Sequence, residues 1–182
     1  MLLKNLIKNC PKEFEKKIIK GLAIDSRKIK KGFIFFALTG SKLEGTKFIN
    51  HAIKKGASVV ICNSGARLKL TRYPILKVKN VQKALAQACC KFYKDKPRNV
   101  IAVTGTNGKS SVANFFLQIF NLNKIPAASI GTLGTMQKNK IKSNQLTTPD
   151  IVSLHKELYN LKRQGVNNVI VEASSHGLQQ GR

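Results

Sequence analysis

The chain has 182 residues, with 33 Lys and Arg against 8 Asp and Glu, and a formal net charge of +25. This length suits one domain of ordinary size or two small ones, and it can bury a core without disulfides or metals. A hydrophobic fraction of 42% excludes a disordered tail. Because no apolar run reaches about 18 residues, we expect no membrane-spanning helix and no membrane partner.

The N-terminus and the cysteines favour a cytoplasmic location. The apolar run that begins at Met1 is too short for the core of a signal peptide. The four cysteines, Cys10, Cys62, Cys89 and Cys90, show no CxxC or Cys/His metal spacing. We therefore expect reduced thiols, with Cys89 and Cys90 as small core residues of a helix, in a reducing compartment.

The positive charge raises the alternative of a basic nucleic-acid-binding module. Lysines outnumber arginines by 27 to 6 and are spread over the whole chain, whereas phosphate-binding surfaces favour the bidentate fork of arginine. We therefore favour a solvated lysine-rich surface and no nucleic-acid partner. One segment is distinctive, because no acidic residue occurs between Asp95 and Asp150, and such a segment attracts polyanionic ligands.

The first half of the chain reads as a small α/β unit. The apolar runs and periodicities predict, in order, a strand at 34–38, a helix from 48 that Gly56 ends, strands at 57–62 and 74–78, and a helix over 81–94. The Lys96-Pro97-Arg98 break marks a boundary after that helix. We expect a domain at 1–80, a connecting helix and linker at 81–97, and a second domain at 98–182.

The second half alternates strands and helices in the same way. The expected elements are a strand at 100–103, a helix at 109–122, a strand at 127–130, a hairpin within 134–143, a helix from 148 and a strand at 169–173. Thr148, Pro149 and Asp150 read as the N-cap, the first position and the first turn of the later helix, which Gly165 ends. This alternation predicts an α/β fold with a parallel, Rossmann-like sheet and binding sites at the strand C-termini.

The strongest motif lies where the 100–103 strand meets the following helix. Gly105-Thr-Asn-Gly-Lys-Ser110 has the glycines, lysine and hydroxyl of a phosphate-binding loop. Lys109 would reach the β- and γ-phosphates of ATP, and the Ser110 hydroxyl would ligate Mg²⁺. The usual pattern has glycine where Val103 stands, so the loop is a variant form. Glu172, at the end of a predicted strand, is the candidate acidic partner of the metal.

The motifs together resemble the Mur ligase family. Thr104-Gly-Thr-Asn-Gly-Lys-Ser-Ser111 resembles its ATP loop, and the Asp25-Ser26-Arg27 segment resembles its UDP-binding domain. Thr147-Thr148-Pro149 and Val171-Glu-Ala-Ser-Ser-His-Gly-Leu178 resemble the members that add a diamino acid to UDP-MurNAc-L-Ala-D-Glu. The resemblance implies an ATP-dependent amide ligase of peptidoglycan precursor synthesis that acts through an acyl phosphate, with meso-diaminopimelate or L-lysine as the incoming amine.

Site residues follow from the same resemblance. It assigns Mg²⁺ to Ser110 and Glu172, a catalytic role to Lys109, and ATP binding to Gly105, Thr106, Asn107, Gly108, Lys109, Ser110 and Ser111. It assigns substrate contacts to Ser26, Ser41, Lys42, Leu43, Thr147, Thr148, Ser174, Gln180 and Arg182.

The resemblance also bears on completeness. The family continues beyond the position that matches Arg182, so it implies a truncated, catalytically incomplete chain, with a separate C-terminal fragment as a candidate partner. Another Mur ligase or a folylpolyglutamate-synthase-like ligase remains the enzymatic alternative, since it would use the same loop.

Overall fold

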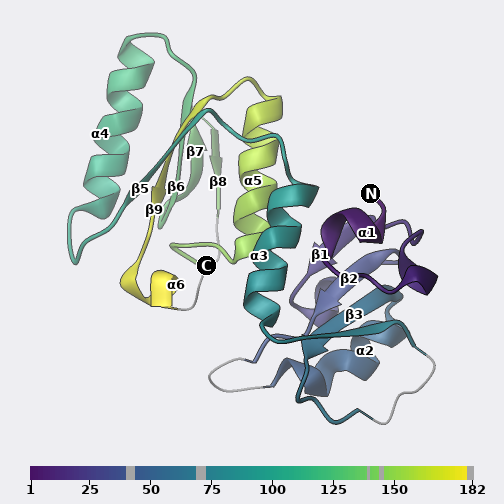
Figure 1. Ribbon diagram of the computed structural model, residues 1–182. Helices are drawn as coiled ribbons and strands as arrows, with labels where there is room; N and C mark the ends of the chain where they lie inside the picture. Colours follow the sequence, from purple (N-terminus) through teal and green to yellow (C-terminus); the bar gives the residue numbers. More distant parts are fainter. Residues whose placement is uncertain (40–43, 69–72, 139, 144–145, 180–182) are drawn as a thin grey trace. The chain divides into compact units, whose positions relative to one another are not determined.

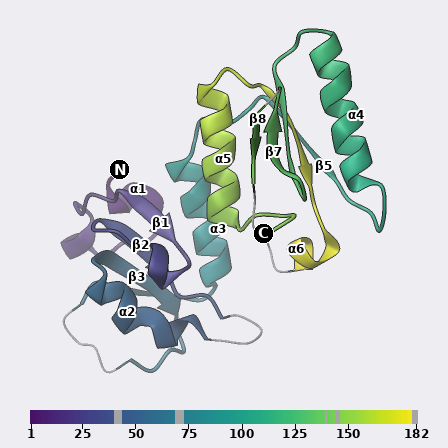
Figure 2. The same ribbon diagram turned by 180° about the vertical axis from the view of Figure 1, so that it is seen from behind.

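The computed structural model describes residues 1–39, 44–68, 73–138, 140–143 and 146–179. The chain forms two compact units, Met1–Phe92 and Tyr93–Arg182, each with its own sheet (Figures 1 and 2). Each unit buries its own set of apolar side chains, so each is described by itself.

The first unit is built on a four-stranded parallel sheet with the order β1-β2-β3-β4. Aliphatic and aromatic residues fill these short strands, and β2 and β3 are buried almost throughout. Gly32 and Gly56 adopt φ of +90° and +94° in the turns that precede β2 and β3, a conformation that glycine adopts readily. The strands are β1 (Gly21–Ala23), β2 (Phe33–Phe36), β3 (Ala57–Asn63) and β4 (Ile75–Val78).

Helices cover the sheet of the first unit. Helix α2 (Ile49–Lys54) packs Ile49 and Ala52 against a cluster that includes Phe35 and Val60. Helix α3 (Val81–Phe92) buries Val81, Leu85, Ala88 and Cys89, whereas Cys90 is exposed, so the expectation of two core cysteines is wrong for Cys90. The remaining helical segments are α1 (Leu3–Leu6) and the 3₁₀ turns η1 (Lys12–Phe14), η2 (Ser26–Lys28) and η3 (Gly45–Phe48).

The second unit contains a five-stranded mixed sheet with the order β5-β9-β6-β7-β8. The first three strands of that order pair in parallel, and β6-β7-β8 continue as antiparallel neighbours. The predicted parallel strands and the predicted hairpin are therefore both present, and they belong to the same sheet. The strands are β5 (Asn99–Val103), β6 (Ala127–Gly131), β7 (Gly134–Gln137), β8 (Lys140–Lys142) and β9 (Asn168–Glu172).

Two long helices lie on opposite faces of this sheet (Figures 1 and 2). Helix α5 (Ile151–Arg163) packs Leu158 and Leu161 against alternate residues of β6 and β9. Helix α4 (Lys109–Leu122), which buries Ala113 and Leu117, contacts β5, β6 and β9. The short helix α6 (Ser175–Gln179) follows β9. Since α4 begins directly after the loop that follows β5, this packing fixes where the loop lies.

The start of α5 differs from the prediction. Asp150, not Thr148, is the N-cap, because its Oδ1 accepts hydrogen bonds from the backbone N–H groups of Val152 and Ser153 at 3.0 Å each. Thr148 is unavailable as a cap, since its hydroxyl donates to the carbonyl oxygen of Glu172 at 2.9 Å. A contact between distant parts of the chain therefore moves the helix start to Ile151.

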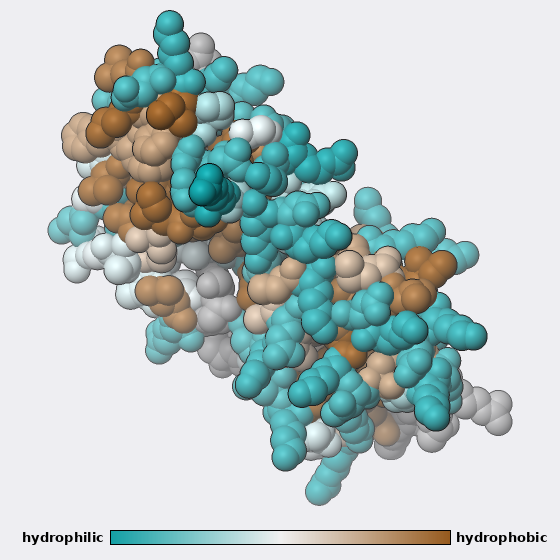
Figure 3. Space-filling model, turned by 45° about the horizontal axis from the view of Figure 1, so that its top comes forward, coloured by the Kyte–Doolittle hydropathy of each residue, from teal (hydrophilic) through white to brown (hydrophobic). Residues whose placement is uncertain are grey.

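Several large apolar side chains of the second unit are exposed. Phe115 and Leu122 of α4 are 60% and 83% exposed, and Val100 and Ile101 of the edge strand β5 are each 45% exposed. Figure 3 shows hydrophobic surface gathered on the α4 side. Large exposed apolar patches occur at interaction sites, in ligand-binding grooves and on aggregation-prone surfaces.

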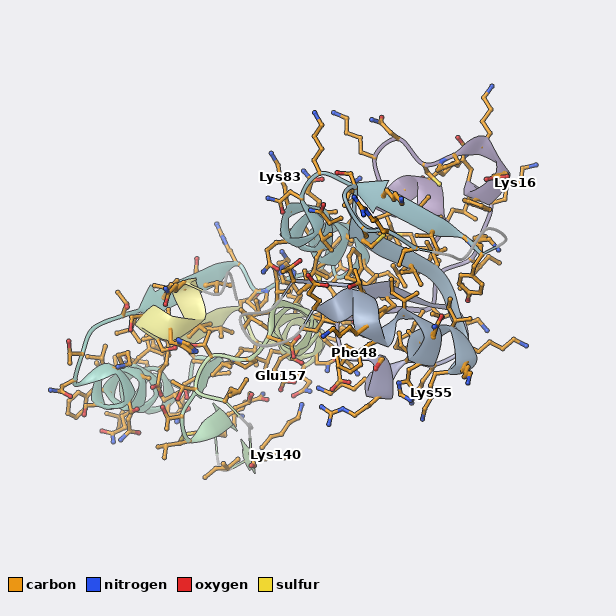
Figure 4. All side chains as sticks on the ribbon, turned by 90° about the horizontal axis from the view of Figure 1, so that it is seen from below. Lys16, Phe48, Lys55, Lys83, Lys140 and Glu157 are labelled. Atoms are coloured by element: carbon orange, nitrogen blue, oxygen red, sulfur yellow. The ribbon has the colours of Figure 1, made fainter. Side chains whose placement is uncertain are left out.

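The positive charge is dispersed over the surface. Figure 4 shows Lys16, Lys55 and Lys83 extending away from the ribbon, and all three residues are exposed. Among the residues that the structure describes, no helix combines the length and the apolar character needed to cross a bilayer.

The cap of α5 gives a first prediction. Replacing Asp150 with Ala removes the acceptor of two backbone N–H groups, so we expect the free energy of unfolding to fall by about 1 kcal/mol. Asp150→Asn, the matched control, keeps a capping oxygen and should retain most of the stability. Urea unfolding followed by circular dichroism measures both, and equal losses in the two variants would contradict this role.

His155 of α5 gives a second prediction. The side chain is half-buried, and burial, with a smaller effect of Lys96, lowers its pKa from 6.5 to about 4. The unfolded chain takes up a proton near pH 6.5 whereas the folded chain resists until about pH 4, so His155 lowers stability as the pH falls through this window. We expect His155→Gln to flatten the pH dependence of Tm between pH 4 and 6.5, and an unchanged slope would refute the assignment.

Candidate functional site

The loop between β5 and α4 has the geometry of an anion-binding turn. Gly105 and Gly108 adopt φ of +146° and +79°, and an added Cβ at Gly108 would meet nothing within 4 Å. Glycine is therefore favoured there by backbone conformation rather than by crowding. Gly108 caps α4 without a side-chain hydrogen bond, so no side chain competes with an anion for the first N–H groups of the helix.

Lys109 folds back over this loop. Its Nζ donates to the carbonyl oxygen of Gly105 at 2.7 Å and to that of Thr106 at 3.2 Å. The ammonium group therefore lies against the same turn that the glycines shape. A phosphate oxygen is a stronger acceptor for an ammonium group than a neutral carbonyl, because the hydrogen bond then joins opposite charges.

The carboxylate of Glu172 lies beside the loop. Glu172 ends β9, pairs in register with Val103 at the end of β5, and is 3% exposed. Its Oε2 accepts hydrogen bonds from the hydroxyls of Ser110, at 2.9 Å, and Thr132, at 3.0 Å. Its Oε1 accepts one from the backbone N–H of Thr132 at 3.2 Å. The structure thus brings together Ser110 and Glu172, the two residues that the sequence assigned to Mg²⁺.

Gly131 makes room for this carboxylate. A Cβ built on Gly131, the last residue of β6, would overlap with the carboxyl group of Glu172. The turn that begins at Thr132 can therefore approach Glu172 closely only because position 131 lacks a side chain. Sequence reasoning missed both Thr132 and Gly131, although the Gly131-Thr-Leu-Gly134 turn at a strand C-terminus was a readable signal.

The Thr147-Thr148 segment contacts the end of β9. The Thr148 hydroxyl, in a residue 4% exposed, accepts a hydrogen bond from the backbone N–H of Ser174 at 3.0 Å and lies 3.1 Å from the Ser174 Oγ. The half-buried Thr147 places its hydroxyl 3.1 Å from that of Thr132. Thr147, Ser174 and Glu172 are therefore gathered at the C-terminal edge of the sheet, on the same side as the loop.

In the first unit, Ser26 lies in a well-defined turn. The Asp25 carboxylate caps η2 by accepting from the backbone N–H of Arg27 at 2.9 Å, and its hydrogen bonds with the Arg27 side chain lower its pKa. The Ser26 hydroxyl, in a residue 5% exposed, lies 2.9 Å from Nδ1 of His51. Sequence reasoning did not find this contact of His51.

The remaining predicted residues divide into two sets. Thr106, Asn107 and Ser111 lie on the loop and the first turn of α4, and all three are exposed. Ser41, Lys42, Leu43, Gln180 and Arg182 lie outside the described residues. Within the described ranges, no group of three or more His, Cys, Asp or Glu side chains could hold a metal by itself. A cation next to Glu172 would therefore need hydroxyl, water or ligand oxygens in addition.

The crowding at Gly131 gives a third prediction. Gly131→Ala forces the Glu172 carboxylate or β6 to move, so we expect a loss of about 1–3 kcal/mol in the free energy of unfolding. In the Gly131→Ala/Glu172→Ala double variant the clash is absent, so the penalty of the added methyl group at position 131 should largely disappear. Urea unfolding of the four proteins of this cycle measures the coupling, and strictly additive losses would contradict a direct clash.

Comparison with known proteins agrees with both units. Residues 18–93 match the model of the Mur ligase family, catalytic domain, and residues 103–182 match the Mur ligase middle domain. The UDP-N-acetylmuramoyl-L-alanyl-D-glutamate--2,6-diaminopimelate ligase of Brucella melitensis is 43% identical over 90% of this chain and 34% of its own length. The Rickettsia conorii protein of the same name is 42% identical over 96% of this chain and 37% of its own length.

Solved structures extend the agreement to the fold. A structure of a UDP-N-acetylmuramoyl-L-alanyl-D-glutamate--2,6-diaminopimelate ligase superposes on the whole chain with a TM-score of 0.84 and 27% identity, and 37% of that protein is covered. The MurF ligase from Thermotoga maritima in complex with ADP shares the fold, with a TM-score of 0.59, 19% identity, and coverage of 86% of this chain and 32% of that one. The chain spans about a third of the length of the curated relatives it matches. From the motifs, the fold and the two domain matches together, this chain belongs to the Mur ligase family.

Proposed function

We propose that the two units bind the two nucleotide substrates of an ATP-dependent ligase that joins 2,6-diaminopimelate to UDP-MurNAc-L-Ala-D-Glu. The relatives named above support this choice over L-lysine, since their names specify 2,6-diaminopimelate. The observation that carries the proposal is the 2.9 Å hydrogen bond from Ser110 to Glu172. It joins a hydroxyl in the first turn of α4 to a carboxylate at the end of β9, and both groups are of the kind that holds Mg²⁺ in phosphoryl-transfer sites.

The loop is the proposed site of the ATP phosphates. The N–H groups of a glycine-rich turn and of a helix N-terminus point at a bound phosphate. The Nζ of Lys109 would exchange its hydrogen bonds to the carbonyl oxygens of Gly105 and Thr106 for bonds to phosphate oxygens. This needs only a short movement of Nζ, because both carbonyls belong to the turn itself. Gly105, Thr106, Asn107, Gly108 and Ser111 would complete the cradle.

The residues beside the loop fit a magnesium ion. Oxygen donors are the ligands Mg²⁺ prefers, and one or two protein oxygens suffice when phosphates and waters supply the rest. Ser110 and Glu172 would hold the ion, and when bound it would neutralise charge on the transferring phosphoryl group. Ser110 would then turn its hydroxyl hydrogen away from Glu172 and offer a lone pair instead.

The proposed reaction forms an acyl phosphate and then an amide. An oxygen of the D-Glu side-chain carboxylate attacks the γ-phosphorus of ATP, and ADP leaves. The amine of the diamino acid then attacks the acyl carbon, phosphate leaves, and the amine loses a proton. Lys109, the proposed catalytic residue, would stabilise the negative charge on the phosphoryl oxygens during the first step.

The other substrate contacts are proposed from the family resemblance. Ser26 would contact the uridine part, together with Ser41, Lys42 and Leu43. Thr147, Thr148 and Ser174 would contact the muramoyl-dipeptide, together with Gln180 and Arg182. The precursor is a water-soluble nucleotide, so we propose that the protein works in the cytoplasm.

Binding measurements test both halves of the proposal. We expect calorimetric titration to show binding of ADP with Mg²⁺ and, separately, of UDP-MurNAc-L-Ala-D-Glu. Lys109→Ala removes a charge-assisted hydrogen bond and should weaken ADP binding about ten- to a hundredfold, with the UDP-sugar affinity unchanged. Ser26→Ala should show the opposite selectivity, because Ser26 belongs to the other unit.

The matched control is Lys124→Ala, which removes an exposed lysine of the second unit outside the loop. If the control weakens ADP binding as much as Lys109→Ala does, the binding is nonspecific attraction to a basic surface. Binding of duplex DNA at physiological salt without binding of either nucleotide would refute the proposal and favour a nucleic-acid module.

A further inference from the structure

The hydroxyl of Thr132 lies between two residues with proposed binding roles. Thr132 opens the turn between β6 and β7, and its Oγ1 is 3.0 Å from Oε2 of Glu172 and 3.1 Å from Oγ1 of Thr147. Its backbone N–H lies 3.2 Å from Oε1 of the same carboxylate. A single residue therefore contacts both oxygens of Glu172.

The Thr132 hydroxyl lies near two acceptors, Oε2 of Glu172 and Oγ1 of Thr147. The Thr132 hydroxyl has one hydrogen, and a carboxylate oxygen can only accept. The single hydrogen of Thr132 serves one of these acceptors at a time, and the carboxylate is the stronger acceptor because it is charged. When the hydrogen points to Glu172, Thr132 gives that carboxylate two donors, its O–H and its backbone N–H.

The two donors of Thr132 restrict the carboxylate because they meet its two different oxygens. Together they fix the rotation of the carboxyl group about its last bond. Ser110, by contrast, meets only Oε2. When Ser110 turns toward a metal, the contacts of Thr132 remain and keep the carboxylate in the same orientation.

We propose that Thr132 is a positioning residue that holds the Glu172 carboxylate ready for the metal of the nucleotide site. The inference rests on the proposed function, because it presumes that Glu172 meets a divalent cation. Side chains that orient a metal ligand through hydrogen bonds typically change metal affinity about 10- to 100-fold when removed. In this role Thr132 acts through Glu172 and is not itself a metal ligand.

Thr132→Val tests this role, because valine keeps the shape of threonine and lacks the hydroxyl. The probe is Mn²⁺ in place of Mg²⁺, with binding to the full chain in saturating ADP followed by the loss of the free-ion electron paramagnetic resonance signal. We expect Thr132→Val to weaken Mn²⁺ binding about tenfold or more. Thr132→Ser, which restores the hydroxyl, should bind within about twofold of the wild type.

The matched control is Thr135→Val. Thr135 lies in β7, is 5% exposed, and its Oγ1 has no hydrogen-bond partner among the described residues. The change is the same hydroxyl-to-methyl replacement in the same unit, so its Mn²⁺ affinity should match the wild type. ADP affinity in EDTA should be the same in all variants, because the inferred role acts only through the metal.

The outcomes separate the inference from the proposed function. Wild-type Mn²⁺ affinity in Thr132→Val would overturn the inference while leaving the nucleotide site intact. An equal loss of ADP affinity in EDTA would overturn it as well, since Thr132 would then be supporting the fold of the loop. If the wild type itself shows no metal-dependent ADP binding, the proposed function fails first and the inference with it.

Discussion

The second unit depends on how it accommodates one buried carboxylate. Removing a carboxylate from water costs several kcal/mol unless hydrogen bonds replace its hydration. Glu172 receives three such bonds, one from Ser110 in the first turn of α4 and two from Thr132 in the turn after β6. The group therefore joins three elements that are far apart in sequence. Moving any one of these elements would remove hydrogen bonds from the buried carboxylate. The bonds that stabilise Glu172 therefore also hold the loop between β5 and α4 in place.

The strand order makes this arrangement possible. β9 lies between β5 and β6, and all three strands run in the same direction. Their C-terminal ends therefore meet at one edge, where β5 delivers the loop, β9 delivers Glu172 and β6 delivers Gly131. In open parallel sheets this edge is where ligands bind. The antiparallel strands β7 and β8 extend the sheet and do not belong to this group of strand ends. Helix α5 packs Leu158 and Leu161 against the face of the sheet opposite to α4.

Local patterns predicted most of the elements, and two of the three failures arise from contacts between distant parts of the chain. The glycine loop and the helix at 109–122 could be found because each signal is contained in a short segment. Ser110 and Glu172 lie 62 residues apart, and the loop pattern and the family resemblance, not a local pattern, paired them. Thr148 was misread as a cap because its competing partner, the carbonyl of Glu172, lies 24 residues away. Thr132 was missed because its role depends on β6 lying next to β9, and strand order is not written in any local pattern. Cys90 was placed in the core because burial of one cysteine does not say which face its neighbour takes.

The fit between Gly131 and Glu172 also has a meaning for sequence comparison. The two positions lie 41 residues apart, yet the space left by the missing Cβ of the first is filled by the carboxyl group of the second. Substitution at either position therefore changes what the other tolerates, so the two should vary together rather than independently. A relative with a side chain at the first position must carry a shorter residue than glutamate at the second, or a shifted β6. Paired changes at these two positions in an alignment would therefore identify relatives in which the carboxylate occupies a different position.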